Sequence, residues 1–139
     1  MTLTIATSLD QVLAGLAAGA RPIAGGTDLV VGARQRKSAM PETLVAIDRL
    51  EELAQIEQNE THTSIGAGVT HARLMTDDIV VDGFTAIADA AALVGSPATR
   101  NVGTLGGNVM NGSPAMDTCL LYTSPSPRDA TLSRMPSSA

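Results

Sequence analysis

The fold follows from residues 21–36, RPIAGGTDLVVGARQR. Residues 21–24 indicate a short extended segment that runs into two glycines, and residues 29–36 predict a helix. Glycines between a strand and a helix let the backbone turn sharply and approach a ligand closely. The free N–H groups and the positive dipole end at the start of such a helix suit a phosphate. A tight turn with Asp28 as the helix cap is an equally open interpretation.

The preceding and following residues predict further strands and helices in alternation. A predicted strand over residues 3–6 is followed by Ser8 and Gln11, which have the spacing of a capping box at a helix start. That helix ends at Gly19 and carries one apolar face, formed by Leu9, Val12, Leu13 and Leu16. Residues 44–47 indicate a buried strand. The resulting order, β-α-β-α-β, favours a small parallel sheet.

The pattern changes after this sheet. Residues 50–53 predict one helical turn, and residues 56–60 and 63–65 predict a hairpin. Thr70 has the position of a cap for a short helix. Residues 84–94 predict a helix that is apolar nearly all round and that we therefore expect to be buried.

These elements predict a mixed α/β or α+β fold with two parts. Residues 1–55 form a small β-α-β subdomain in this interpretation. Residues 56–118 form the start of a second, mixed α+β subdomain. The glycine-rich segment 100–117, RNVGTLGGNVMNGSPAMD, falls in the second part.

We interpret segment 100–117 as a long ligand-binding loop. Glycine loses more conformational entropy on ordering than other residues, so an ordered segment of this kind needs a compensating interaction. Loops longer than about 12 residues in compact domains are usually functional or disordered. A flexible surface loop is the alternative interpretation.

The composition of the 139-residue chain excludes several classes of function. Aromatic residues make up 1% of the chain and the net charge is −5. This balance disfavours single-stranded nucleic acid and anionic lipid as partners, so we expect neither a nucleic acid nor a membrane. A lone Cys119 excludes an internal disulfide and an iron–sulfur cluster within this chain, and it favours a reducing, cytoplasmic setting. With only His62 and His71 beside it, no metal site is expected.

The last residues differ in composition from the rest. Residues 119–139 contain five Ser and three Pro and show no apolar period. Such a segment cannot bury enough apolar surface to fold. We expect a disordered tail that is not native to the protein, and a natural disordered terminus is the alternative.

Three segments together resemble one known family. AGGTDL at residues 24–29, SIGAGVTH at residues 64–71 and TRNVGTLGGNVMNGSPAMDT at residues 99–118 closely resemble the flavin-binding subunit of molybdenum hydroxylases. That group includes the xanthine dehydrogenase, carbon monoxide dehydrogenase and aldehyde oxidase relatives, whose FAD-binding domain is of the PCMH type. The resemblance covers residues 3–118 in the family's order.

The resemblance implies FAD as the cofactor and assigns roles residue by residue. The first FAD segment, which wraps the pyrophosphate with backbone amides, corresponds to Ala24, Gly25, Gly26, Thr27 and Asp28. The second, which contacts the diphosphate and the ribityl chain, corresponds to Thr104, Gly106, Gly107 and Asn108. Asp117 matches an aspartate near the flavin end of the cofactor. Arg100 either offsets cofactor charge or is a solvated surface residue.

The same resemblance implies electron transfer within a larger complex. Electrons would pass from a 2Fe-2S subunit through FAD to NAD or another acceptor, while a molybdenum-cofactor subunit hydroxylates the substrate. No residue of this chain is expected to be catalytic, and we expect the chain alone to be inactive because the family's resemblance stops at Thr118. A non-catalytic module that binds a nucleotide or phosphate is the alternative function.

Overall fold

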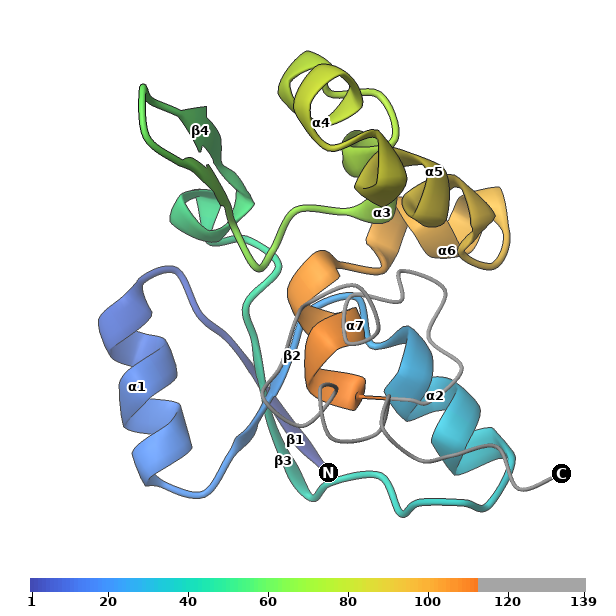
Figure 1. Cartoon of the computed structure of the whole chain (residues 1–139). Helices are drawn as coiled ribbons and strands as arrows, with labels where there is room; N and C mark the ends of the chain where they lie inside the picture. Colours follow the sequence, from blue (N-terminus) through green and yellow to red (C-terminus); the bar gives the residue numbers. More distant parts are fainter. Residues whose placement is uncertain (113–139) are drawn as a thin grey trace, which may run out of the picture.

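The computed structural model describes residues 1–112 (Figure 1). Its main sheet has three parallel strands in the order β1-β3-β2, which are β1 (Thr2–Ile5), β3 (Thr43–Ala46) and β2 (Arg21–Ile23). The central strand pairs Leu44 with Leu3 on one side and with Arg21 on the other. The predicted β-α-β-α-β order and the parallel sheet are confirmed.

Helix α1 (Leu9–Ala17) packs against one face of this sheet. The Ser8 hydroxyl accepts a hydrogen bond from the Gln11 N–H at 3.4 Å, as predicted. The Gln11 side chain, however, accepts from the N–H of Thr7 at 2.9 Å, one residue before the position that a capping box uses. Of the predicted apolar face only Val12 is buried, and the three leucines of that face remain 39–55% exposed.

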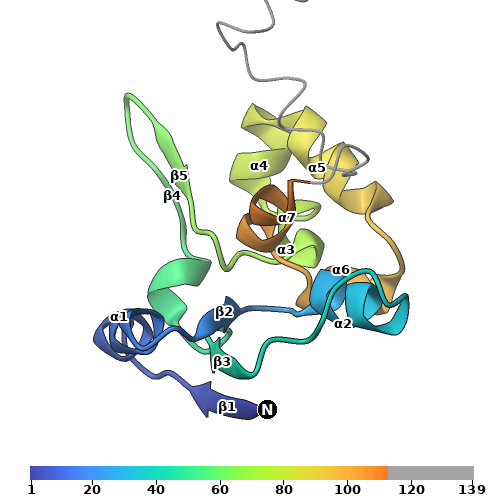
Figure 2. The same ribbon diagram turned by 90° about the horizontal axis from the view of Figure 1, so that it is seen from below.

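Helix α2 (Thr27–Arg34) lies on the other side of the sheet from α1 in both views (Figures 1 and 2). It begins two residues earlier than predicted. The reason is the conformation of Gly26, which has φ +67° and turns the backbone directly into the helix. Thr27 and Asp28 are therefore in the first helical turn, and the interpretation of Asp28 as the helix cap is wrong.

A hairpin follows the sheet, as predicted. The 3-10 helix η1 (Glu51–Ala54) leads into β4 (Ile56–Gln58), which pairs antiparallel with β5 (Thr63–Ile65). The hairpin extends away from the helices (Figure 2). Helix α3 (His71–Leu74) begins after Thr70, whose hydroxyl accepts from the Arg73 N–H at 3.3 Å and confirms the predicted cap.

Two helices then pack around α3. The sequence did not indicate α4 (Asp78–Gly83), which is capped by the Asp77 carboxylate. Helix α5 (Thr85–Leu93) was expected to be buried, and that expectation is wrong: Ala88 and Ala91 are buried, but Leu93 is 76% exposed. The helix contacts α3 and α4 and leaves its other side to solvent.

The predicted loop over residues 100–117 is also wrong, as far as the described residues extend. It contains the end of α6 (Pro97–Val102) and all of α7 (Leu105–Asn111). Ser96 and Thr104 precede these helices, and each hydroxyl accepts from the N–H three residues further on. Small hydroxyl residues and glycines, which indicated a loop, serve here as helix caps and helix residues.

The apolar core consists of two clusters. One lies among the helices after the hairpin and contains Val69, Leu74, Val80, Ala88 and Ala91. The other lies between α1 and the sheet and contains Ala6, Val12, Val45 and Leu50. None of the helices in residues 1–112 has the length and apolar character that crossing a bilayer demands.

The predicted limits of the two subdomains, residues 1–55 and 56–118, stay predictions. Asp117 and the expected tail at residues 119–139 lie outside the described residues.

Leu74→Ala tests the cluster around α3. Leu74 is fully buried, so the substitution leaves a cavity and should lower the free energy of unfolding by about 2–5 kcal/mol in urea denaturation. Leu93→Ala is the matched control, because that leucine is exposed and its loss should change stability by less than about 0.5 kcal/mol. Equal losses for the two variants would contradict this assignment of the core.

Candidate functional site

A cavity of about 670 Å³ opens where the first glycine segment meets α7. Its volume lies within the range of about 300–1,000 Å³ that is usual for small-molecule and cofactor sites. Residues 21–29 form one wall, and the opposite wall contains Thr104, Gly107 and Asn108. The cavity therefore lies between two of the three segments that the sequence analysis selected.

The first wall offers unused hydrogen-bond donors. The first helical backbone bond of α2 runs from the Val30 N–H to the Gly26 carbonyl at 3.0 Å. Within residues 1–112, the N–H groups of Thr27, Asp28 and Leu29 donate to no protein acceptor. All three residues line the cavity, so the positive end of the helix dipole faces it.

The start of α7 differs, because its amides are already bonded within the protein. Leu105 N–H donates to the Val69 carbonyl and Gly106 N–H donates to the Ala67 carbonyl, both at 2.9 Å. The next amide, that of Gly107, donates to the Thr104 hydroxyl at 3.1 Å. Helix α7 therefore borders the cavity with the sides of residues such as Gly107 and Asn108, and its first amides are not available as donors.

The two adjacent glycines of α7 have different surroundings. A Cβ on Gly106 would lie 2.7 Å from the Cβ of Ala67, and Gly106 does not line the cavity. Gly107 does line it, and among residues 1–112 a Cβ there would meet only the Thr104 hydroxyl, at 3.1 Å. Gly106 thus permits packing of α7 on the chain behind it, whereas Gly107 leaves space on the cavity side.

The two walls are in direct backbone contact at Gly25. A Cβ at this position would collide with the Val102 carbonyl and would lie 2.9 Å from the Gly103 nitrogen. The first glycine segment therefore approaches the α6–α7 junction more closely than any residue with a side chain could. This contact joins two segments that are almost 80 residues apart in the sequence.

Residues 66–71, which belong to the family-like segment 64–71, support α7 from behind. Besides the two bonds from the start of α7, the His71 N–H donates to the Gly103 carbonyl at 3.0 Å, and Thr70 and Thr104 form an antiparallel bridge. His71 is 2% exposed and is also among the residues that line the cavity. His62, by contrast, is exposed at the hairpin turn and contacts Asn59 and Thr61.

Arg100 is half-buried and bonded to the backbone, so it is not the solvated surface residue of one interpretation, and its role toward cofactor charge stays a prediction. Its Nη1 donates to the carbonyls of Val94 and Gly95, both at 3.0 Å, so it binds the C-terminal end of α5. The side chain does not line the cavity.

Sequence reasoning missed several cavity residues. The apolar ones include Ile23, Val31, Val94 and Met110, and Arg21 is also part of the lining. Adjacency to a motif could have indicated Ile23, which directly precedes the first glycine segment. The position of Val94 depends on how α5 packs, and no local pattern indicates that. Nowhere in residues 1–112 do three His, Cys, Asp or Glu side chains gather as a metal site would require.

Comparisons with known proteins identify related chains. Residues 1–124 match the family model described as the FAD binding domain in molybdopterin dehydrogenase. The nicotinate dehydrogenase FAD-subunit of Eubacterium barkeri is 39% identical over 95 residues, which are 68% of this chain and 32% of the relative. The carbon monoxide dehydrogenase medium chain of Afipia carboxidovorans is 35% identical over 106 residues, which are 76% of this chain and 36% of the relative.

A solved structure agrees with these matches. The carbon monoxide dehydrogenase from Hydrogenophaga pseudoflava that lacks the Mo-pyranopterin moiety of its molybdenum cofactor superposes with a TM-score of 0.80 at 31% sequence identity. The alignment covers 87% of this chain and 43% of that one. Over its matched part, the chain spans about a third of the length of the curated relatives.

Gly25→Ala tests the contact between the two walls. The added methyl group would overlap the Val102 carbonyl, so the walls must separate, and we expect a loss of about 1–3 kcal/mol in the free energy of unfolding. Gly83→Ala is the control, because no atom of the described residues lies within 4 Å of a Cβ there. It should leave stability unchanged or raise it by up to about 1 kcal/mol. A Gly25 variant as stable as the Gly83 variant would disprove the close contact.

Proposed function

This chain belongs to the family of FAD-binding domains of molybdopterin dehydrogenases, and we propose that it holds FAD in the cavity between residues 24–28 and α7. FAD is the cofactor of this family. The location of the cofactor and the role of each residue are our proposals, and they rest on the donors, spaces and charges of the cavity described above.

The amides at the start of α2, which have no acceptor among residues 1–112, carry this proposal. A pyrophosphate is a dianion that requires several donors, and Thr27, Asp28 and Leu29 present three N–H groups at the positive end of a helix. Ala24, Gly25 and Gly26 shape the turn that exposes these amides. The Asp28 carboxylate is the one unfavourable charge, and we propose that it points away from the phosphates.

The opposite wall fits the cofactor through space and side chains rather than through helix amides. Gly107 leaves room for close approach, and Asn108 supplies an amide group suited to the hydroxyls of a ribityl chain. Thr104 is 8% exposed and holds the first turn of α7 in shape by bonding Gly107. Gly106 supports the site by packing on Ala67. Asp117 stays a proposed contact outside the described residues.

The proposed activity is electron transfer within an oxidoreductase complex. FAD accepts and passes on electrons when it is bound. By analogy with relatives named as FAD-subunits and medium chains of dehydrogenases, we propose a molybdenum-cofactor subunit and a 2Fe-2S subunit as partners. NAD or another acceptor would receive the electrons, and we propose a cytoplasmic setting.

A titration of the purified chain with FAD tests the proposal directly. Binding should change the flavin absorbance near about 450 nm and the flavin fluorescence. ADP, which carries the pyrophosphate without the flavin, should compete, because the α2 amides bind the shared group. Binding of ADP with no binding of FAD would instead favour the non-catalytic nucleotide module. Absence of binding by both would refute the proposed function.

Gly107→Val should abolish FAD binding and leave the fold nearly intact. The valine side chain would fill the cavity side of α7, while residues 1–112 offer only the Thr104 hydroxyl as a close neighbour. The measurements are FAD affinity by fluorescence titration and far-UV circular dichroism. Gly83→Val, at the end of α4, is a matched glycine substitution outside the cavity and should retain FAD affinity. FAD affinity equal to that of the unsubstituted chain in the Gly107 variant would remove this residue from the site.

A further inference from the structure

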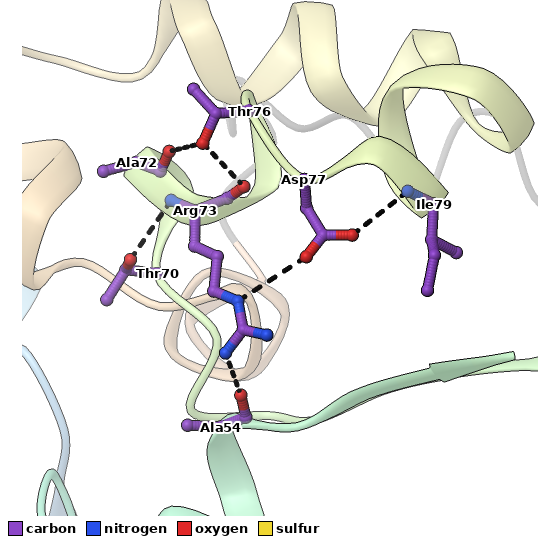
Figure 3. A network of polar contacts seen from close by, with 7 residues as sticks. All are labelled: Ala54, Thr70, Ala72, Arg73, Thr76, Asp77 and Ile79. Carbon is purple, nitrogen blue, oxygen red and sulfur yellow. Dashed lines mark hydrogen bonds and ion pairs between the residues drawn. The ribbon is translucent and has the colours of Figure 1, made fainter.

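We propose that Arg73 is a positioning residue for the FAD site: it fixes the segment to which α7 is attached and so sets where Gly107 and Asn108 face the cavity. This inference rests on the proposed function for its consequence, and it concerns a side chain outside the three motifs that line or support the cavity. Figure 3 shows the contacts of Arg73.

The first step is the attachment of α7 to residues 66–71. Three backbone bonds join the two, from Leu105 and Gly106 to the carbonyls of Val69 and Ala67 and from His71 to the carbonyl of Gly103. The first turn of α7 therefore moves with residues 66–71.

The second step is the attachment of residues 66–71 to the end of η1. Gly66 N–H donates to the Gln55 carbonyl at 2.8 Å, and Gly68 N–H donates to the Leu53 carbonyl at 2.7 Å. A Cβ on Gly66 would collide with the same Leu53 carbonyl. Residues 66–71 thus form the middle layer between the end of η1 and the start of α7.

The third step is the bond that Arg73 adds to this layer. Its Nη1 donates to the Ala54 carbonyl at 2.7 Å, between the two carbonyls that bind Gly66 and Gly68. Three consecutive carbonyls, at residues 53–55, are therefore held by residues 66–73. Of the three bonds to these carbonyls, only the bond from Arg73 comes from a side chain. It connects α3 to Ala54, the last residue of η1.

Asp77 orients the guanidinium. Its Oδ2 lies 3.6 Å from the Arg73 Nε, and its Oδ1 accepts the Ile79 N–H at 3.2 Å (Figure 3). The carboxylate thereby caps α4 and fixes the direction of the arginine at once. Thr70 caps α3 immediately before Arg73, so the backbone that carries the arginine is held as well.

The size of the expected effect is moderate. The Arg73 side chain is 47% exposed, so solvent screening weakens its charged contacts. Loss of the bond should loosen residues 66–71 without unfolding the chain. We expect Arg73→Met to raise the dissociation constant for FAD by about three- to tenfold, the change that corresponds to one modest hydrogen bond.

The test compares four variants of the full 139-residue chain by amide hydrogen exchange without FAD and by FAD titration. In Arg73→Met, the amides of Gly66, Gly68, Leu105 and Gly106 should exchange faster, while those of β3 stay unchanged. Arg73→Lys retains a charged donor and should restore part of the protection. Asp77→Asn retains an acceptor for Ile79 and should give a smaller increase in exchange. Arg34→Met is the control, because this exposed arginine at the end of α2 lies outside residues 51–55 and 66–73 and does not line the cavity, and it should change neither measurement.

The outcomes separate this inference from the proposed function. Unchanged amide exchange at Leu105 and Gly106 in Arg73→Met would overturn the inference. Faster exchange throughout the chain, β3 included, would also overturn it, because it would indicate a general loss of stability. If Arg73→Met does not fold, the exchange pattern of Arg73→Lys and Asp77→Asn decides in the same way. If the unsubstituted chain binds no FAD, the proposed function fails, and the exchange data, measured without cofactor, still decide whether Arg73 positions α7.

Discussion

The backbone of Gly25 lies directly against the carbonyl of Val102 and the amide of Gly103, and the cavity depends on this contact. Because Gly25 has no side chain to hold Val102 and Gly103 away, the start of α2 and the residues Gly107 and Asn108 of α7 border the same cavity. Any larger residue at position 25 would force the walls apart. The site therefore requires a glycine here for packing between two parts of the protein, in addition to any close approach of a ligand.

The N-terminal amides of α2 and of α7 differ in what they bind. The amides of α2 at Thr27, Asp28 and Leu29 belong to residues that line the cavity and have no partner within residues 1–112, so that part of the chain leaves them available to an anion. The amides of α7 at Leu105 and Gly106 are bonded to the layer behind them. One helix thus provides electrostatic attraction, and the other provides a surface whose position is fixed by hydrogen bonds. This division explains how two glycine-rich motifs contribute to one site without duplicating each other.

The segments that carry the family resemblance meet around the cavity, but adjacent residues within a segment have different surroundings. Gly107 borders the cavity, whereas Gly106 packs on Ala67. Likewise, residues 64–71 were selected as a motif, yet their backbone bonds to residues 53–55 and 103–106 hold other segments in place. A motif marks residues that serve one site together. It does not distinguish those that face a ligand from those that hold the others in place.

The sequence by itself determined the alternation of strands and helices, the parallel sheet and the short hairpin. Each of these depends on local patterns: a capping residue such as Ser8 or Thr70, a buried run such as residues 44–47, or a glycine at a turn. Only the tertiary structure decided that residues 97–111 form two helices, that α5 is half exposed, and that Arg100 binds the end of α5. A hydroxyl or a glycine suits a loop and a helix start equally well, and a guanidinium binds whichever carbonyls lie within its reach. Such choices are fixed by distant neighbours, here by the contacts of Gly25 with Val102 and of Gly106 with Ala67, which form only when the chain folds.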